Sequence, residues 1–136
     1  AADVWSATSY QQLRNDALAV ERWNRLHPGD PQRVPYVTQA LAGTSGPVIA
    51  SSDFMKAVPD MVSRWIGRPF VSLGTDGFGR SDTRESLRRH FEVDAEHIVV
   101  ATLSALSQQG QVPAGVVART IQEYGIDPEK VEPRLS

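Results

Sequence analysis

Residues 70–85 read FVSLGTDGFGRSDTRE and contain the most informative pattern in this sequence. The apolar run 70–73 predicts a short strand, and glycines at 74, 77 and 79 predict a tight loop after it, because glycine tolerates the positive φ angles that such loops need. Asp82 followed by Glu85 is typical of a helix N-terminus that is capped by an Asp side chain. The order strand, glycine loop, capped helix indicates an α/β fold.

The same alternation continues toward the N-terminus. We expect a strand over Val48–Ala50, followed by a helix over Phe54–Ile66 whose Pro59 forces a kink or a late start. Residues Val4–Thr8 read as another short strand. Ser9–Gln12 forms a capping box that starts a helix, and we expect this helix to break at Asn15–Asp16.

Two further helices are predicted toward the C-terminus. Asp94 has the position of an N-cap for a helix that ends at Gly110. Pro113 suits the first turn of a last helix, which Gly125 and Ile126 would end as the glycine and the apolar partner of a C-terminal cap. The strands 48–50 and 70–73 are short and apolar, as in a sheet that is covered on both faces.

Size and composition fit a single domain spanning residues 1–136. Hydrophobic residues make up 40% and the net charge is -2, so nothing directs the chain to nucleic acid or to an acidic membrane surface. No apolar run approaches the roughly 20 residues that span a bilayer. The chain has no Cys, which excludes disulfides, thiolate metal sites and Cys nucleophiles and is easiest to reconcile with the cytoplasm.

The glycine loop is the one candidate site. It has three possible roles: a tight turn with at least one glycine at positive φ, an interface between subunits or domains, or a phosphate-binding loop. Its spacing matches neither established phosphate-binding motif, and we interpret Asp76 as a turn former and Asp82 as a cap. The arginines at 84, 88 and 89 form a positive face that is either solvated or matched to an acidic partner.

No other residue pattern indicates chemistry. The histidines at 27, 90 and 97 lack the spacing of a metal site, and no Gly-x-Ser-x-Gly motif is present. We therefore predict no catalytic, cofactor-binding or metal-binding residue in this chain. The candidate signature and interface residues are Gly74, Asp76, Gly77, Phe78, Gly79, Arg80, Ser81 and Asp82.

Several segments closely resemble one known family. The run LGTDGFGRSD at 73–82, with HFEVD at 90–94, ERWN at 21–24, RVPY at 33–36 and SDFMK at 52–56, is similar to the C-terminal domain of the homodimeric, single-chain family of bacterial pyruvate dehydrogenase first components. The resemblance runs from Val4 to the end of the chain. Transketolase C-terminal domains share Phe78-Gly79-x-Ser81 and are more distantly similar.

The resemblance implies a three-layer α/β/α domain on a mostly parallel mixed sheet, in the manner of a transketolase C-terminal domain. It implies a parent enzyme that decarboxylates pyruvate with thiamine diphosphate and Mg²⁺, and that reductively acetylates the lipoyl group of the dihydrolipoyl acetyltransferase component. The parent would be a homodimer whose cofactors lie between two preceding domains. No cofactor is therefore expected in this chain, whose role would be in assembly and in shaping the approach to the active site.

Domains of that family begin with additional strand and helix material. By this comparison, we expect the chain to be truncated at the N-terminal side of its own domain and to be part of a much longer polypeptide. Two other functions stay open: an anion- or nucleotide-binding module centred on residues 74–82, and the C-terminal domain of another transketolase-type enzyme.

Overall fold

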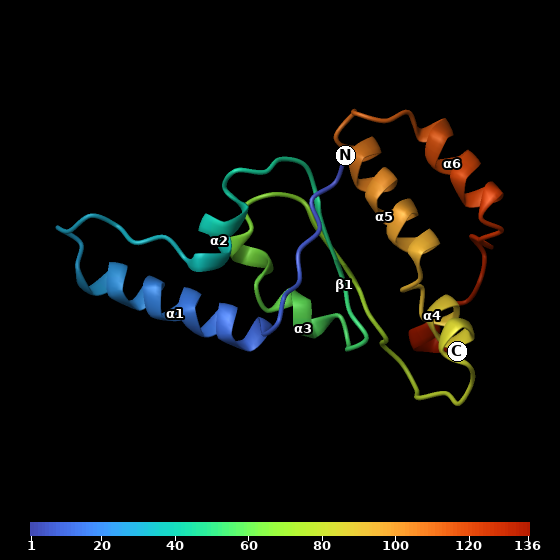
Figure 1. Ribbon diagram of the computed structural model, residues 1–136, viewed down its shortest axis with the longest axis horizontal. Helices are drawn as coiled ribbons and strands as arrows, with labels where there is room; N and C mark the ends of the chain where they lie inside the picture. Colours follow the sequence, from blue (N-terminus) through green and yellow to red (C-terminus); the bar gives the residue numbers. More distant parts are fainter.

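The computed structural model describes all residues from 1 to 136 and alternates helices with two strands (Figure 1). The helices and strands are α1 (Tyr10–Leu26), α2 (Tyr36–Leu41), β1 (Val48–Ser51), α3 (Ala57–Asp60), β2 (Phe70–Leu73), α4 (Arg84–His90), α5 (Ala95–Gln108) and α6 (Ala114–Glu123). Two 3₁₀ turns, η1 (Ser63–Trp65) and η2 (Pro133–Leu135), complete the list. No helix is both long and apolar enough to cross a membrane.

The two strands form a parallel sheet at the centre of the molecule. Val48 lies opposite Phe70 and Ser51 opposite Leu73, and the connection between the strands passes through α3 and η1. A parallel pair requires such a crossover because both strands must start at the same edge. This confirms the α/β fold that the alternation predicts.

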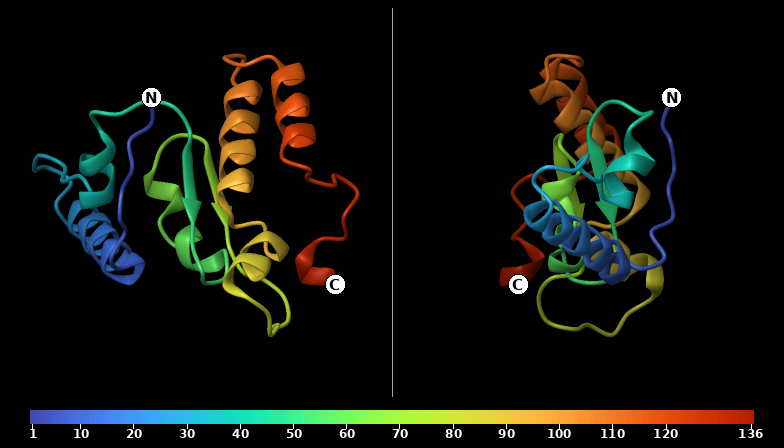
Figure 2. Two further views of the ribbon diagram at one scale, coloured as in Figure 1. Left: turned by 45° about the vertical axis from the view of Figure 1, so that its right-hand side comes forward. Right: turned by 90° about the vertical axis from the view of Figure 1, so that its left-hand side faces the viewer.

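Helices cover both faces of this sheet, which gives three layers (Figure 2). On one face, α5 contacts both strands and α6 packs against α5. On the other face, α1 and α2 lie over a small core of three buried residues, with partly buried neighbours that include Val48 and Phe70 from the strands. The buried core residues are Val37, Val62 and Ile66.

The predicted strand over Val4–Thr8 is wrong. Residues 1–8 are exposed and carry no regular structure, and none of them makes a backbone or side-chain hydrogen bond. A strand exists only through pairing with a neighbour, and the structure offers this segment no neighbouring strand. The capping role of Ser9 at the start of α1 is confirmed, since its Oγ accepts from the backbone N–H of Gln12 at 3.2 Å.

The predicted break at Asn15–Asp16 is also wrong, because α1 runs without interruption from Tyr10 to Leu26. Both polar side chains have partners that are compatible with a helix. Asn15 accepts from the Gln11 side chain at 2.9 Å, one turn earlier. Asp16 accepts from the backbone N–H of Tyr36 at 2.7 Å, so it caps the start of α2 rather than interrupting α1.

The expected late start is found, because α3 begins at Ala57 with Pro59 in its first turn, and the helix also ends after that turn. Instead of one helix over Phe54–Ile66, the chain forms the single turn of α3 and then η1. Pro59 lies in the first turn of α3, where an N–H would have no partner within the helix, and its ring is buried. The predicted helix is thus replaced by two short pieces, of which the first carries Pro59.

The predicted ends of the C-terminal helices are largely confirmed. Asp94 accepts from the N–H of His97 at 3.0 Å and caps α5. Gly125 (φ 60) follows α6, and Ile126 donates to the carbonyl of Ile121 at 3.1 Å, which is the Schellman arrangement. The predicted cap Asp82 is displaced by one position: Thr83 caps α4 by accepting from the N–H of Ser86, while Asp82 accepts from the N–H of Thr83.

Candidate functional site

The glycine loop lies at the carboxyl edge of the sheet. It follows β2, and the segment Ser52–Lys56 that follows β1 lies beside it. Ligand sites of open α/β sheets are usually found at this edge, because the loops after parallel strands meet there. The position of the loop therefore fits a functional role, and its contacts decide which of the three expected roles it supports.

The first part of the loop is pressed against the segment that follows β1. Thr75 donates from its backbone N–H to the carbonyl of Phe54 at 2.9 Å and from its hydroxyl to the carbonyl of Asp53 at 2.8 Å. A Cβ at position 74 would lie only 2.6 Å from the carbonyl oxygen of Phe54. Gly74 is thus required by a close approach of two backbone segments.

The middle of the loop contacts the C-terminal segment. Gly77 has a φ of 115°, and a Cβ there would lie 2.7 Å from the carbonyl oxygen of Pro133. The expectation of positive φ at one or more of these glycines is confirmed at Gly77. Gly79 lies outside that region of φ and has open space around its Cβ position, so no steric requirement for glycine exists there.

Both acidic residues of the loop bind backbone groups. Asp76 accepts from the backbone N–H of Lys56 at 3.0 Å, and Asp82 accepts from that of Thr83 at 2.7 Å. The remaining residues of the predicted site, Phe78, Arg80 and Ser81, are exposed at the tip of the loop. The structure therefore brings the predicted residues together as a rigidly anchored loop with an exposed tip.

The chain offers no ligand cluster for the Mg²⁺ ion of a diphosphate–Mg²⁺ pair. No group of three His, Asp or Glu side chains is placed to hold a metal ion. The N–H of Thr75 and the carboxylates of Asp76 and Asp82 are already engaged within the protein. The residues at this edge therefore do not fit the Mg²⁺ ion of such a pair.

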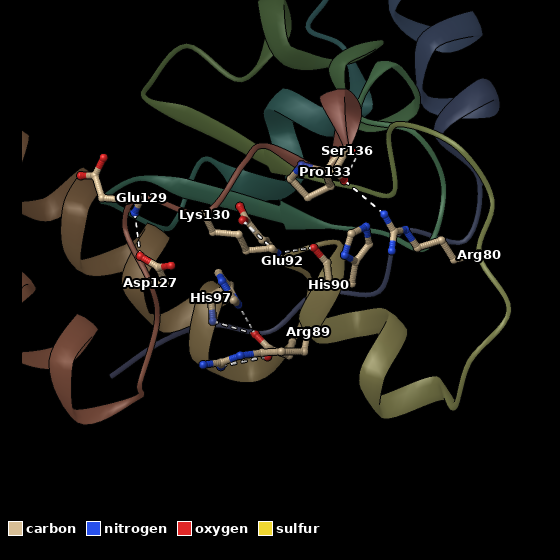
Figure 3. A network of polar contacts seen from close by, with 11 residues as sticks. Arg80, Arg89, His90, Glu92, His97, Asp127, Glu129, Lys130, Pro133 and Ser136 are labelled. Carbon is tan, nitrogen blue, oxygen red and sulfur yellow. Dashed lines mark hydrogen bonds and ion pairs between the residues drawn. The ribbon is translucent and has the colours of Figure 1, made fainter.

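A polar groove of about 1330 Å³ lies between the end of β1, α4, the start of α5 and the C-terminal segment. Figure 3 shows the network beside it, in which Lys130 bridges α4 and the C-terminal segment. Its ammonium group donates to the carbonyl of His90 at 2.6 Å and lies 3.4 Å from Glu92. Arg89 pairs with Asp94 at 3.2 Å and donates to the carbonyl of Tyr124 at 2.7 Å.

The pair of Asp94 and His97 is the tightest contact in this network, with 2.5 Å between the carboxylate and Nδ1. Burial alone would raise the pKa of Asp94, but hydrogen bonds from the backbone and ring of His97 and from Arg89 lower it below its usual value. Partial desolvation and the positive charges of Arg80 and Lys130 lower the pKa of His90. These groups fasten α4, α5 and the C-terminal segment to one another.

Sequence reasoning missed this network. The spacing of Asp94 and His97 on one helix turn was the available signal, because residues three apart on a helix are neighbours. No sequence pattern indicated the contacts of Lys130, since its partners lie 38 and 40 residues away. The arginines of the predicted positive face differ: Arg89 is paired, Arg88 lies 3.6 Å from Asp53, and Arg84 makes no ion pair or hydrogen bond.

Comparison with known proteins places this geometry in a family. Residues 1–94 match the family described as the transketolase-like TK C-terminal domain. The chain belongs to this family. The match covers both strands, the glycine loop and α4, and it confirms the resemblance of the loop to transketolase C-terminal domains.

Several proteins that are similar to this chain are E1 components, the first components, of pyruvate dehydrogenase. The chain is 53% identical over 97% of its length to the pyruvate dehydrogenase E1 component of Pseudomonas aeruginosa, of which it covers 15%. It is 49% identical over 93% of its length to that of Mycolicibacterium smegmatis, of which it covers 14%. It is 47% identical over 98% of its length to that of Escherichia coli, of which it covers 15%. The chain thus spans about one seventh of the length of these relatives.

Proposed function

We propose that this chain is the C-terminal domain of the E1 component of a pyruvate dehydrogenase complex. The observation that carries the proposal is the 47–53% identity to E1 components from P. aeruginosa and E. coli over nearly the whole chain. The parent enzyme would decarboxylate pyruvate and reductively acetylate the lipoyl group of the dihydrolipoyl acetyltransferase component. We further propose that the parent is a cytoplasmic homodimer.

Thiamine diphosphate and Mg²⁺ would supply the decarboxylation chemistry in parts of the parent outside residues 1–136. The chain covers only 15% of the E1 components of P. aeruginosa and E. coli, which supports this division. The contribution of this chain would be structural. A rigid domain with an anchored loop at the carboxyl edge of its sheet supports assembly and borders the approach to the active site.

Two other functions compete with this proposal. A related enzyme that acts on sugar phosphates would share the transketolase-like fold, but the named relatives are all pyruvate dehydrogenase components. An independent anion-binding module centred on the loop is the other alternative. It is disfavoured because the spacing of the loop glycines matches neither established phosphate-binding motif.

The test is an assay of the full-length polypeptide with thiamine diphosphate, Mg²⁺ and ferricyanide as an artificial electron acceptor. We expect ferricyanide reduction that depends on pyruvate, and no turnover of ketose phosphates. Turnover of a ketose phosphate without pyruvate oxidation would replace the proposal by the transketolase-type alternative. The 136-residue chain alone is expected to be inactive.

A further inference from the structure

Large apolar side chains are exposed around the glycine loop, which lies at one end of the molecule (Figures 1 and 2). The ring of Phe78 is 81% exposed and that of Phe54 is 68% exposed. Leu135 is 71% exposed in η2, and the contact between Gly77 and Pro133 holds η2 against the loop. We call the exposed residues Phe54, Met55, Phe78 and Leu135 the glycine-loop patch.

The patch continues into a groove of about 460 Å³ between the loop and α4. The apolar residues Leu87, Phe91 and Val93 line this groove beside the ring of Phe78. Because Gly74 and Gly77 fix the loop to neighbouring backbone, the exposed rings sit on a preformed surface. Exposed aromatic side chains next to an apolar groove are typical of the centre of a protein–protein interface.

The rim of the groove is positively charged. Arg80, Arg84 and Arg88 line it together with two carboxylates, Asp53 and Asp82. Arg84 has no partner in the chain, and Arg88 lies 3.6 Å from Asp53. The three arginines outnumber the two carboxylates, so the surface suits a partner that carries carboxylates around apolar side chains.

The chain as a whole exposes more surface than a compact monomer of its size. The chain exposes 9136 Å², whereas a compact monomer of 14.9 kDa is expected to expose about 7,000 Å². Only ten residues of 136 are buried. The excess is of the order of an interface between domains that pack together permanently, and it includes the extended residues 1–8 as well as the glycine-loop patch.

We propose that the glycine-loop patch and its groove are covered by another part of the same parent polypeptide. The covering segment lies outside residues 1–136 and presents apolar side chains bordered by carboxylates. This inference rests on the proposed function, because the named relatives are about seven times longer than this chain. The loop would then act as an interdomain contact, one of the three roles expected from its sequence.

Cysteine labelling tests this directly, because the chain contains no Cys. Gly79→Cys places a thiol at the loop tip, where a Cβ has open space, and leaves Phe78 intact. Gly29→Cys is the matched control, since a Cβ there is equally free and the loop after α1 is distant from the patch (Figure 1). The rate of reaction with N-ethylmaleimide is measured by mass spectrometry of each labelled peptide, in the 136-residue chain and in the full-length polypeptide.

We expect the thiols of both variants to react rapidly in the 136-residue chain. In the full-length polypeptide, the rate for Gly79→Cys should fall at least tenfold, while the rate for Gly29→Cys changes by less than threefold. Adding Arg84→Glu to Gly79→Cys should restore reactivity at least threefold in the full-length polypeptide. Arg119→Glu, at an exposed arginine on α6, should not do so.

Equal labelling rates for Gly79→Cys in the short chain and the full-length polypeptide would overturn the proposal. Protection of this loop-tip thiol that already appears in the 136-residue chain and grows with its concentration would assign the patch to a second copy and would also overturn it. Labelling reports packing and not turnover. A full-length polypeptide that fails the pyruvate assay but protects the loop-tip thiol would therefore contradict the proposed function and leave the interdomain contact standing.

Discussion

At the scale of single residues, two of the three loop positions require glycine, each for a different physical reason. Gly74 permits two backbone segments to approach each other closely, and Gly77 combines a positive φ with a contact to Pro133. Gly79 has neither constraint. The loop is therefore anchored at its first two glycines, and its tip at Phe78 and Gly79 is held outward by that anchoring.

Replacement of Gly77 should be far more damaging than replacement of Gly79. In Gly77→Ala, a Cβ would lie 2.7 Å from the carbonyl oxygen of Pro133 in a backbone conformation that L residues rarely adopt. We expect a loss of about 1–3 kcal/mol in the free energy of unfolding. Gly79→Ala should change it by less than about 0.5 kcal/mol. Urea denaturation of both variants measures this, and an equal loss in the two would contradict the steric account.

Asp94 should make the stability depend on pH at the acid end. The folded-state pKa of Asp94 is lowered, so between that value and the unfolded value of about 3.9 the unfolded state binds more protons. The stabilisation is thus complete above pH of about 4 and is lost as the pH falls through the folded pKa. Asp94→Ala should cost about 1 kcal/mol at pH 7 through loss of the cap of α5.

The variant Asp94→Asn keeps the cap but not the charge. We expect it to be less stable than the parent chain at pH 7 and to approach the stability of the parent chain as the pH falls below the folded pKa. Asp3→Asn, at an exposed residue without partners, should show no difference at any pH. Urea denaturation across the acid range measures both variants. A gap between Asp94→Asn and the parent chain that is constant across this range would show that the charge of Asp94 does not stabilise the fold.

At the scale of elements, three helices end in the same way, but one of them has a non-glycine residue where the other two have glycine. α4, α5 and α6 all end in the same Schellman arrangement, in which the residue after the cap has a positive φ. That residue is Gly110 after α5 and Gly125 after α6, but Glu92 (φ 62) after α4. Val93 completes the motif by donating to the carbonyl of Arg88 at 2.9 Å.

Exchanging residue types at these positions should have opposite effects. Glu92→Gly removes a side chain from a left-handed conformation that costs it about 1 kcal/mol. The half-exposed ion pair to Lys130 offsets only part of this gain. We expect Glu92→Gly to raise the melting temperature and Gly125→Ala to lower it, as measured by calorimetry. A lower melting temperature for Glu92→Gly would assign the bridge from Glu92 to Lys130 a larger role than its geometry indicates.

Local signals predicted the elements that depend on local physics. The capping roles of Ser9 and Asp94, both strands of the sheet and the effect of Pro59 were visible in the sequence because each depends on neighbours a few residues away. The strand at Val4–Thr8 failed because pairing requires a distant partner. The helix break at Asp16 failed because its partner, the N–H of Tyr36, lies 20 residues further along. The network around Lys130 was invisible for the same reason.

At the scale of the whole molecule, the domain has helices on both faces of a sheet that contains only two strands. Sheets usually have about five or six strands, and the exposed area exceeds that of a compact monomer. Both features agree with a domain that completes its packing within a larger enzyme. The family match explains the fold. The proposed function depends on the catalytic groups lying outside residues 1–136.

Isothermal titration calorimetry with thiamine diphosphate and Mg²⁺ tests that placement most directly. The cofactor is titrated into the 136-residue chain and, in parallel, into the proposed full-length parent polypeptide. We predict no binding to the 136-residue chain, because it lacks a metal-binding cluster, and micromolar or tighter binding to the full-length polypeptide. Micromolar binding to the 136-residue chain alone would contradict the account.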